Sequence, residues 1–462
     1  MSSSIPSGTG TLLPVFSLPN NHGIGTLGQE AYAFIDWLAA TNQCVWQMLP
    51  LEMPGYGNSP YQCLSPFAKN TLLIDVEAFP KEVKAERKHY PLTTKVDYDL
   101  LNERAELLDT IADTIYEDIG TRNAVEKFTE ENKWVTTWAE FYSLKVANAL
   151  KPWWEWTVFE STACARNRQK TLQYVFDLQW KKLKTYAQDK GVKIMGDIPF
   201  YIAKDSDCVW ENPEWFSTDV KGVSSAVAGV PPDYFSKTGQ YWGNPVYSWS
   251  SHKLEVLTWW KSRLDNALAT YDIVRIDHFR AFADYWSIPG GAASAAEGQW
   301  IEGVGFDVFK LYENWQELPF VVEDLGERTE LLKTLMKDCP YPAMGILQFG
   351  FDSSEGSAFK PSDMIENTVY YTGTHDNATI VSWYAEASVK DRVILQTVLQ
   401  KADLEHTDFI DLALTSKSKL KIFPMQDRLG LTSLARLNTP GLLSEENWRW
   451  RCPENYRDVL GK

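Results

Sequence analysis

Four acidic residues stand at the ends of short apolar runs in this chain. The acids are Asp197, Asp277, Glu323 and Asp376, and the runs that they close are residues 192–197, 273–277, 320–323 and 368–376. Each run is rich in β-branched and aromatic residues, which is typical of parallel strands buried on both faces. The strands of a parallel barrel end at one mouth, so we expect four carboxylates around one pocket. Converging carboxylates, without cysteine or clustered histidine nearby, indicate chemistry on sugars.

The run that ends in Asp277 also carries Arg275. Side chains alternate along a strand, so Arg275 and Asp277 should point to the same face. The guanidinium would keep Asp277 ionised by lowering the pKa of its carboxyl. An ionised carboxylate held in this way suits a glycosyl nucleophile. The alternative is a structural ion pair at a strand end.

Glu323 and Asp324 are adjacent acids, so they should face opposite sides of the chain. Glu323 continues the strand, and we expect it to point into the mouth. A partly apolar site near a second carboxylate would raise its pKa, as a general acid requires. Asp324 could then cap the following helix.

His375 and Asp376 follow the fourth apolar run. Asp376 could hold sugar hydroxyls and balance the positive charge that develops at an anomeric carbon. His375 could donate to the same sugar ring, although a lone histidine can equally be a structural residue. Residues 229–245 are predicted to form a long loop, in which Trp242 could stack on a pyranose ring. The alternative for this segment is an ordinary surface loop.

Eight strand-like runs could position these side chains. They begin at residues 11, 44, 192, 273, 320, 345, 368 and 419. This number predicts an α/β fold, a (β/α)8 TIM barrel with inserted, largely helical subdomains. A doubly wound sheet is the alternative. The predicted division is a first part of the barrel at 1–78, a mostly helical insertion at 79–190 and the rest of the barrel at 191–462, with substrate-binding loop insertions at about 199–250 and 281–318.

Composition excludes several classes of function. The net charge of -16 argues against a nucleic-acid partner. The start of the chain has no signal-peptide pattern, and no apolar run reaches membrane-spanning length, so a cytoplasmic protein without membrane association is predicted. The histidines form neither an HExxH motif nor a close cluster with cysteine, so we predict no metal site; calcium held by scattered oxygens stays open.

A glycine motif offers a competing interpretation. Residues 23–28 match GxGxxG, and Glu52 follows at a distance suited to a dinucleotide-binding fingerprint. The fingerprint needs its first glycine directly after a strand, whereas residues 17–22 intervene here. The preferred interpretation is a glycine-rich barrel loop that leads into a helix.

Taken in order, these motifs resemble glycoside hydrolase family 77, the amylomaltases or 4-alpha-glucanotransferases. The resemblance covers essentially the whole chain. It is carried by residues 17–25, 46–61 and 229–247, by the three acid motifs around 277, 323 and 376, and by residues 424–427, 436–438 and 447–451.

The resemblance implies a barrel enzyme that transfers segments of α-1,4-glucan between maltodextrins, in maltose, maltodextrin or glycogen metabolism. It implies Asp277 as nucleophile, Glu323 as general acid/base and Asp376 as stabiliser of the transition state, in a retaining double displacement without a cofactor. Donor and acceptor would be maltooligosaccharides or other α-1,4-glucans, with no obligate protein partner. The positions that match substrate contacts are Ser59, Tyr61, Asp197, Asp233, Gln240, Trp242, Arg275, His375 and Asn438.

Three rival functions stay open on the sequence. They are a hydrolase of the α-amylase type, a non-catalytic glucan-binding protein, and a nucleotide-dependent enzyme that uses the glycine motif.

Overall fold

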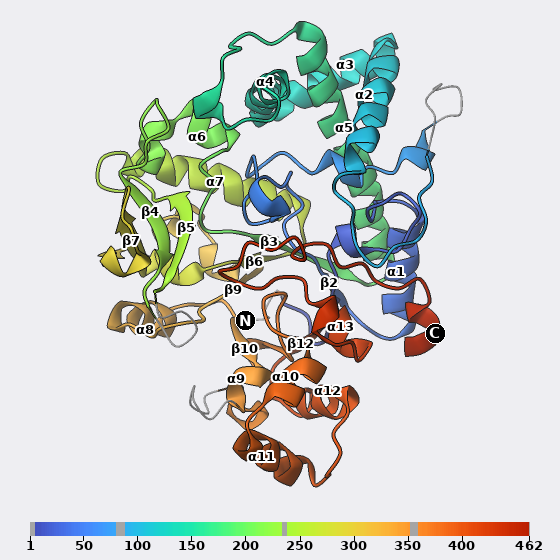
Figure 1. Cartoon of the computed structure of the whole chain (residues 1–462), viewed down its shortest axis with the longest axis vertical. Coiled ribbons are helices and arrows are strands. Elements are labelled where there is room, and N and C mark those ends of the chain that lie inside the picture. The colour runs from blue at the N-terminus through green and yellow to red at the C-terminus, as the bar shows by residue number, and fades with distance from the viewer. Residues whose placement is uncertain (1–4, 80–87, 233–237, 352–358, 462) are drawn as a thin grey trace.

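Eight parallel strands close into a barrel at the centre of the computed structural model, which describes residues 5–79, 88–232, 238–351 and 359–461 (Figure 1). β1 pairs with both β2 and β12, which closes the sheet and excludes the doubly wound alternative. In barrel order the strands are β1 (Gly8–Leu12), β12 (Leu420–Pro424), β11 (Thr368–Tyr371), β10 (Ala343–Ile346), β9 (Phe320–Val322), β6 (Ile273–Ile276), β3 (Lys193–Ile198) and β2 (Val45–Gln47).

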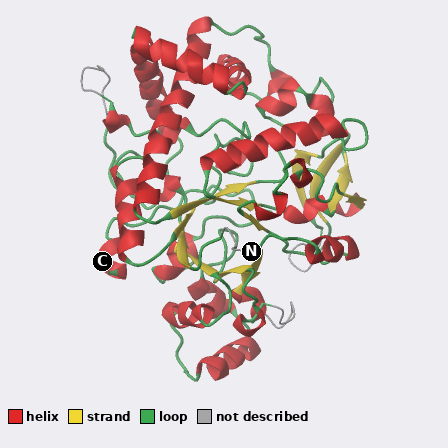
Figure 2. Ribbon diagram, turned by 180° about the vertical axis from the view of Figure 1, so that it is seen from behind, coloured by secondary structure: helices red, strands yellow, loops and turns green. Residues whose placement is uncertain are grey.

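The predicted barrel is confirmed, and the burial of its strands explains why it could be predicted. Every residue of β6, β9 and β2 is buried, because helices cover the outside of the barrel and side chains fill its interior. Seen from behind in Figure 2, helices surround the strands. A strand buried on both faces must be apolar along its whole length, which is the pattern that the sequence displays.

Two of the barrel strands begin and end at other residues than the sequence indicated. β1 ends at Leu12, before Pro14, which lacks the N–H that a barrel strand would need. The run that begins at 345 was placed too late, because β10 is Ala343–Ile346 and the next residues form the short helix α9 (Leu347–Gly350).

Fourteen α-helices cover the barrel or extend from it within the described residues. The helix expected after the glycine-rich loop is α1, and α2 to α5 lie where a helical insertion was predicted; α2 to α5 form the upper layer of Figure 1. Whether residues 79–190 make a separate subdomain stays a prediction. The helices other than α9 are α1 (Gln29–Ala40), α2 (Leu101–Tyr116), α3 (Ile119–Glu131), α4 (Trp134–Ala147), α5 (Ala163–Asp189), α6 (Asp207–Glu211), α7 (Lys253–Thr270), α8 (Glu330–Lys337), α10 (Ile380–Glu386), α11 (Val389–Leu399), α12 (His406–Leu414), α13 (Met425–Arg428) and α14 (Tyr456–Leu460).

A second, antiparallel sheet was missed by the sequence reasoning. Its order is β5 (Gln240–Pro245), β4 (Ala226–Val230), β7 (Asp284–Pro289) and β8 (Gln299–Glu302), and it lies on the left of Figure 1. The predicted long loop at 229–245 is therefore wrong for its described residues, most of which belong to the paired strands β4 and β5. β4 gains its other partner, β7, from a distant segment, and local periodicity does not reveal such a pairing.

The glycine motif is a packed loop, as preferred from the sequence. A Cβ at Gly25 would lie 1.9 Å from the carbonyl oxygen of Val15, so only glycine fits there. At the start of α1, a Cβ on Gly28 would lie 2.9 Å from Cγ of Asp75. A carboxylate thus occupies the helix N-terminus where a dinucleotide pyrophosphate would have to bind. Among the described residues, no helix is long and apolar enough to cross a membrane.

Candidate active site

A cleft of about 410 Å³ opens where the barrel strands end. Asp277 directly follows β6, and His375 and Asp376 follow β11, so parallel strands deliver these side chains to one mouth. The predicted site residues that line the cleft are Ser59, Tyr61, Gln240, Trp242, Asp277, His375, Asp376 and Asn438.

Arg275 is buried in the floor below this cleft and joins three of the four predicted acids. Its Nη1 lies 2.5 Å from Oδ2 of Asp197, and its Nη2 lies 3.0 Å from Oδ1 of Asp277. The same Nη2 lies 3.4 Å from Oε2 of Glu323. These two Nη2 distances limit the separation of the Asp277 and Glu323 oxygens to at most 6.4 Å. Arg275 therefore places the nucleophile candidate and the acid candidate side by side.

Burial has the largest effect on the protonation of Asp277. It raises the pKa of the carboxyl well above its ordinary value; Arg275 lowers this pKa, while Glu323 and Asp197 raise it. Arg275 lowers this pKa as predicted, but burial has the larger effect, so the prediction of a low Asp277 pKa is wrong in its net direction.

Asp197 differs from the other acids in position and surroundings. It lies inside β3, opposite Arg275 in the register of β3 and β6, and is fully buried. Its Oδ2 accepts hydrogen bonds from the Tyr61 hydroxyl at 2.8 Å and from Arg275. Asp197 thus holds Arg275 and Tyr61 in place from below the cleft.

Glu323 lies beside the cleft, where a residue with a strained backbone binds it. His278 has a left-handed backbone, with φ of 50°, and its N–H donates to Oε2 of Glu323 at 2.7 Å. Both contacts of Glu323, with His278 and Arg275, are made through Oε2. Asp324 faces away and pairs with Arg328, but it does not cap α8, whose N-cap is Thr329.

Asp376 is held at the cleft by two polar side chains. Its Oδ1 accepts a hydrogen bond from Nδ2 of Asn438 at 2.7 Å, and its Oδ2 lies 3.4 Å from Nε2 of His375. The His375 ring stacks on the Tyr61 ring, with centroids 5.0 Å apart. Burial lowers the pKa of His375 below its ordinary value, so the imidazole is neutral near pH 7.

Aromatic side chains form part of the cleft wall. Trp242 on β5 packs edge-on against His278, with centroids 4.9 Å apart, and donates to Oε1 of Gln240 at 3.1 Å. Tyr201 and Trp448 also line the cleft and were assigned no role from the sequence. In the sequence these two residues are simply aromatic residues near Asp197 and Asn438. That pattern does not show whether an aromatic side chain lines a cleft or packs in the core.

Four predicted site residues do not line this cleft. Asp197, Arg275 and Glu323 belong to the network beneath or beside it, and Asp233 lies outside the described residues. Segments that the sequence reasoning did not assign line the cleft instead, namely residues 439–444 and Asn447.

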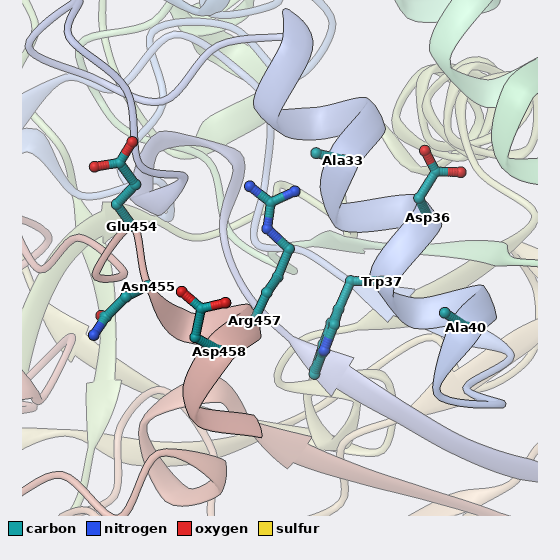
Figure 3. Close-up of a pocket in the computed structure, with 8 residues that line it drawn as sticks. All are labelled: Ala33, Asp36, Trp37, Ala40, Glu454, Asn455, Arg457 and Asp458. Atoms are coloured by element: carbon teal, nitrogen blue, oxygen red, sulfur yellow. The ribbon is translucent and has the colours of Figure 1, made fainter. Parts of the chain in front are cut away.

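A larger cavity, of about 780 Å³, lies away from this chemistry (Figure 3). It lies between α1 and the segment around α14, and Asp36 on its rim is already paired with Lys190. No predicted site residue lines it, so the smaller cleft is the candidate active site.

Comparisons with known proteins find a family and relatives that match almost the whole chain. The profile of a family described as 4-alpha-glucanotransferase, glycoside hydrolase family 77, matches residues 13–456. A 4-alpha-glucanotransferase of Streptococcus pneumoniae is 37% identical over 97% of this chain and 93% of its own, and one of Synechocystis is 39% identical over 98% and 95%. The solved amylomaltase of Streptococcus agalactiae in complex with acarbose is 35% identical, with a TM-score of 0.91 over 98% of both chains. The amylomaltase structure from Corynebacterium glutamicum, at 16% identity and a TM-score of 0.76 over 98% of this chain and 74% of its own, shares the fold.

Proposed function

This chain belongs to glycoside hydrolase family 77, the 4-alpha-glucanotransferases, and on that premise we propose that it transfers α-1,4-glucan segments by a retaining double displacement. The observation that carries the stereochemistry is the limit of 6.4 Å between Oδ1 of Asp277 and Oε2 of Glu323. Retaining glycosidases hold their carboxyl groups about 5–5.5 Å apart, and inverting ones about 6.5–9.5 Å apart to admit a water. The contact of both acids with one nitrogen of Arg275 favours the shorter, retaining spacing, in which Asp277 attacks as a nucleophile and Glu323 serves as the acid.

In the first step Asp277 attacks the anomeric carbon of the donor glucan. The bond from that carbon to the glycosidic oxygen breaks, and Glu323 gives its proton to the leaving oxygen. This step requires an ionised Asp277 beside a protonated Glu323. Because Arg275 and His278 both contact Oε2, we assign the proton to Oε1 of Glu323.

In the second step the 4-hydroxyl of an acceptor glucan attacks the same carbon. Glu323 takes the proton of this hydroxyl, the ester bond to Asp277 breaks, and the carboxylate is restored. Two inversions at one carbon give net retention. Asp376 stabilises both transition states, since its carboxylate faces the cleft and is fixed by Asn438.

The remaining residues bind and orient the glucan. Trp242 and Trp448 offer apolar faces to the sugar rings, and the neutral His375 ring can donate to a sugar hydroxyl. Ser59, Gln240 and Asn438 supply polar groups along the cleft. Arg275, Asp197 and Tyr61 position the reacting acids from below, and Asp233 keeps its proposed substrate role from the resemblance alone.

Maltooligosaccharides and other α-1,4-glucans are the proposed donors and acceptors. The proposed setting is maltodextrin or glycogen metabolism in the cytoplasm, which rests on the sequence alone.

Incubation with maltotriose tests the proposal against hydrolysis. Transfer yields glucose together with maltodextrins longer than the substrate, because an acceptor hydroxyl replaces water at the intermediate. Chromatography of the products after short times should resolve the longer chains. Products that are only shorter than maltotriose would identify a hydrolase, and unreacted maltotriose with retained binding would identify a glucan-binding protein.

Asp197→Asn should shift the acid limb of the activity profile to lower pH. Asp197 raises the pKa of Asp277 and also occupies part of the Arg275 charge, so its neutralisation lowers that pKa. Asp277 then stays ionised, and able to attack, at more acidic pH. The measurement is kcat/KM for maltotriose as a function of pH. An acid limb that stays in place or moves to higher pH would contradict the shared role of Arg275.

A further inference from the structure

His22, Glu77 and His89 come together outside the active site. Within the described part of the chain they are the one group of three such residues whose ligand atoms all lie within 4.8 Å of one another. None of the three lines the catalytic cleft. They come from separate segments, namely the turn before α1, the 3-10 helix Val76–Ala78 and the segment that leads into α2.

His22 is buried with a nitrogen that needs a partner. Only 7% of the residue is exposed, and its Nδ1 has no hydrogen-bond partner in the structure. A buried ring nitrogen without a partner has lost its hydrogen bond to water and has formed no other hydrogen bond in its place. A ring nitrogen of this buried side chain is one of the three ligand atoms of the group.

The backbone around each of the three residues is already fixed. Tyr90 N–H donates to the carbonyl oxygen of Asn21 at 2.7 Å, which ties the neighbours of His89 and His22 together. Gln179 on α5 bonds both the N–H and the carbonyl of Asp75, and Asp75 accepts from the N–H of Glu77 at 3.0 Å. The backbone of the site is therefore assembled by the fold, and Glu77 and His89 reach it with exposed side chains.

We propose that His22, Glu77 and His89 bind one zinc ion, with water as the fourth ligand. Two imidazoles and one carboxylate are a donor set that suits Zn²⁺, and the harder Mg²⁺ prefers an all-oxygen shell. Bonds of about 2.0–2.1 Å bring tetrahedral ligands to about 3.3 Å from one another, so the side chains must close by about 1.5 Å at most. Rotation of the exposed His89 ring contributes to this movement.

The positive charges of two buried arginine side chains should weaken the binding of zinc. Arg104 and Arg451 lie near His22 and hydrogen-bond to backbone carbonyls, including Leu72 and Leu18. Their charges oppose a dication across a low-dielectric interior, so we expect roughly micromolar rather than nanomolar affinity. The ion would act as a staple between the turn before α1 and the two segments that enter the helical insertion. This proposal is independent of the transferase chemistry, and it revises the prediction of no metal site.

The test uses the full chain after treatment with a chelator. Zn²⁺ at about 100 times its Kd should raise the midpoint of thermal unfolding by about 3 °C or more. Co²⁺ as a probe should give the visible absorption of a tetrahedral nitrogen and oxygen site. Mg²⁺ at the same concentration should do neither.

Two variants locate the site. His89→Ala and Glu77→Gln change exposed side chains, so both should fold, and each should weaken zinc binding by at least about 100-fold, since even groups that only orient a ligand contribute 10–100-fold. His252→Ala, which removes a histidine elsewhere, is the matched control and should keep wild-type binding. An absent Zn²⁺ stabilisation in the parent, or one that persists in both site variants, would overturn the proposal. Maltotriose turnover of the metal-free variants reports separately on the transferase.

Discussion

Asp277→Asn should abolish the disproportionation of maltotriose. The variant keeps the size of the side chain but loses the carboxylate that attacks the anomeric carbon, so no covalent intermediate can form. We expect kcat/KM to fall by about 10⁴-fold or more, or about 5 kcal/mol of transition-state stabilisation. Binding of maltotriose should persist, because the aromatic wall and the polar groups of the cleft are unchanged.

The measurement is the rate of glucose release from maltotriose, with calorimetry to follow binding. Asp307→Asn is the matched control, since Asp307 is a surface acid that pairs with Lys253 away from the cleft. It should retain wild-type rates. Turnover of Asp277→Asn within tenfold of the parent would exclude Asp277 as nucleophile. Turnover absent from the parent as well, with binding intact, would instead favour a glucan-binding protein.

Glu323→Ala should separate the two chemical steps. Cleavage of maltotriose needs a proton on the leaving oxygen, so its rate should fall by about 10²–10⁴-fold. With α-maltosyl fluoride the leaving group needs no proton, and the first step should proceed. The intermediate then accumulates, because no base is left to activate an acceptor hydroxyl. Azide, which attacks without losing a proton, should restore turnover and give the α-maltosyl azide.

The configuration of that azide tests the mechanism. The α product requires two inversions, through a covalent bond to Asp277, whereas a β product would indicate direct displacement and would overturn the double displacement. Glu327→Gln is the matched control, because Glu327 is an exposed acid in the same loop whose described contact is made by its backbone carbonyl. It should behave as the parent with maltotriose, and azide should leave its rate unchanged.

Both experiments depend on Arg275, which no single motif could place. The sequence predicted that Arg275 and Asp277 share a face, and their contact of 3.0 Å confirms it. The contacts of Arg275 with Asp197 and Glu323 come from neighbouring strands, β3 and β9, on either side of β6. Burial, together with the charges of Glu323 and Asp197, outweighs Arg275 and reverses the expected pKa shift of Asp277, so the shift depends on all neighbours at once.

The antiparallel sheet shows where local patterns stop being informative. β4 and β5 are short and partly exposed, and β4 is completed by β7 from a later part of the chain. Their residues read as a loop in the sequence, since neither a long apolar run nor a regular alternation marks them. Trp242 was therefore predicted to project from a loop, whereas it lies on a strand that packs beside His278.

The sequence by itself determined the barrel, the three acids and the family. A buried parallel strand must be apolar along its length, and an acid at its end must emerge at the mouth. Both features can therefore be recognised in a short stretch of sequence. Only the tertiary structure decided which neighbours hold each acid. Asp197 is buried beneath the cleft rather than placed on its rim. Glu323 accepts a hydrogen bond from His278, whose backbone is left-handed. His22, Glu77 and His89 come together from three separate segments. Each of these outcomes depends on distances between residues that are remote in the chain, and such distances are set when the barrel closes.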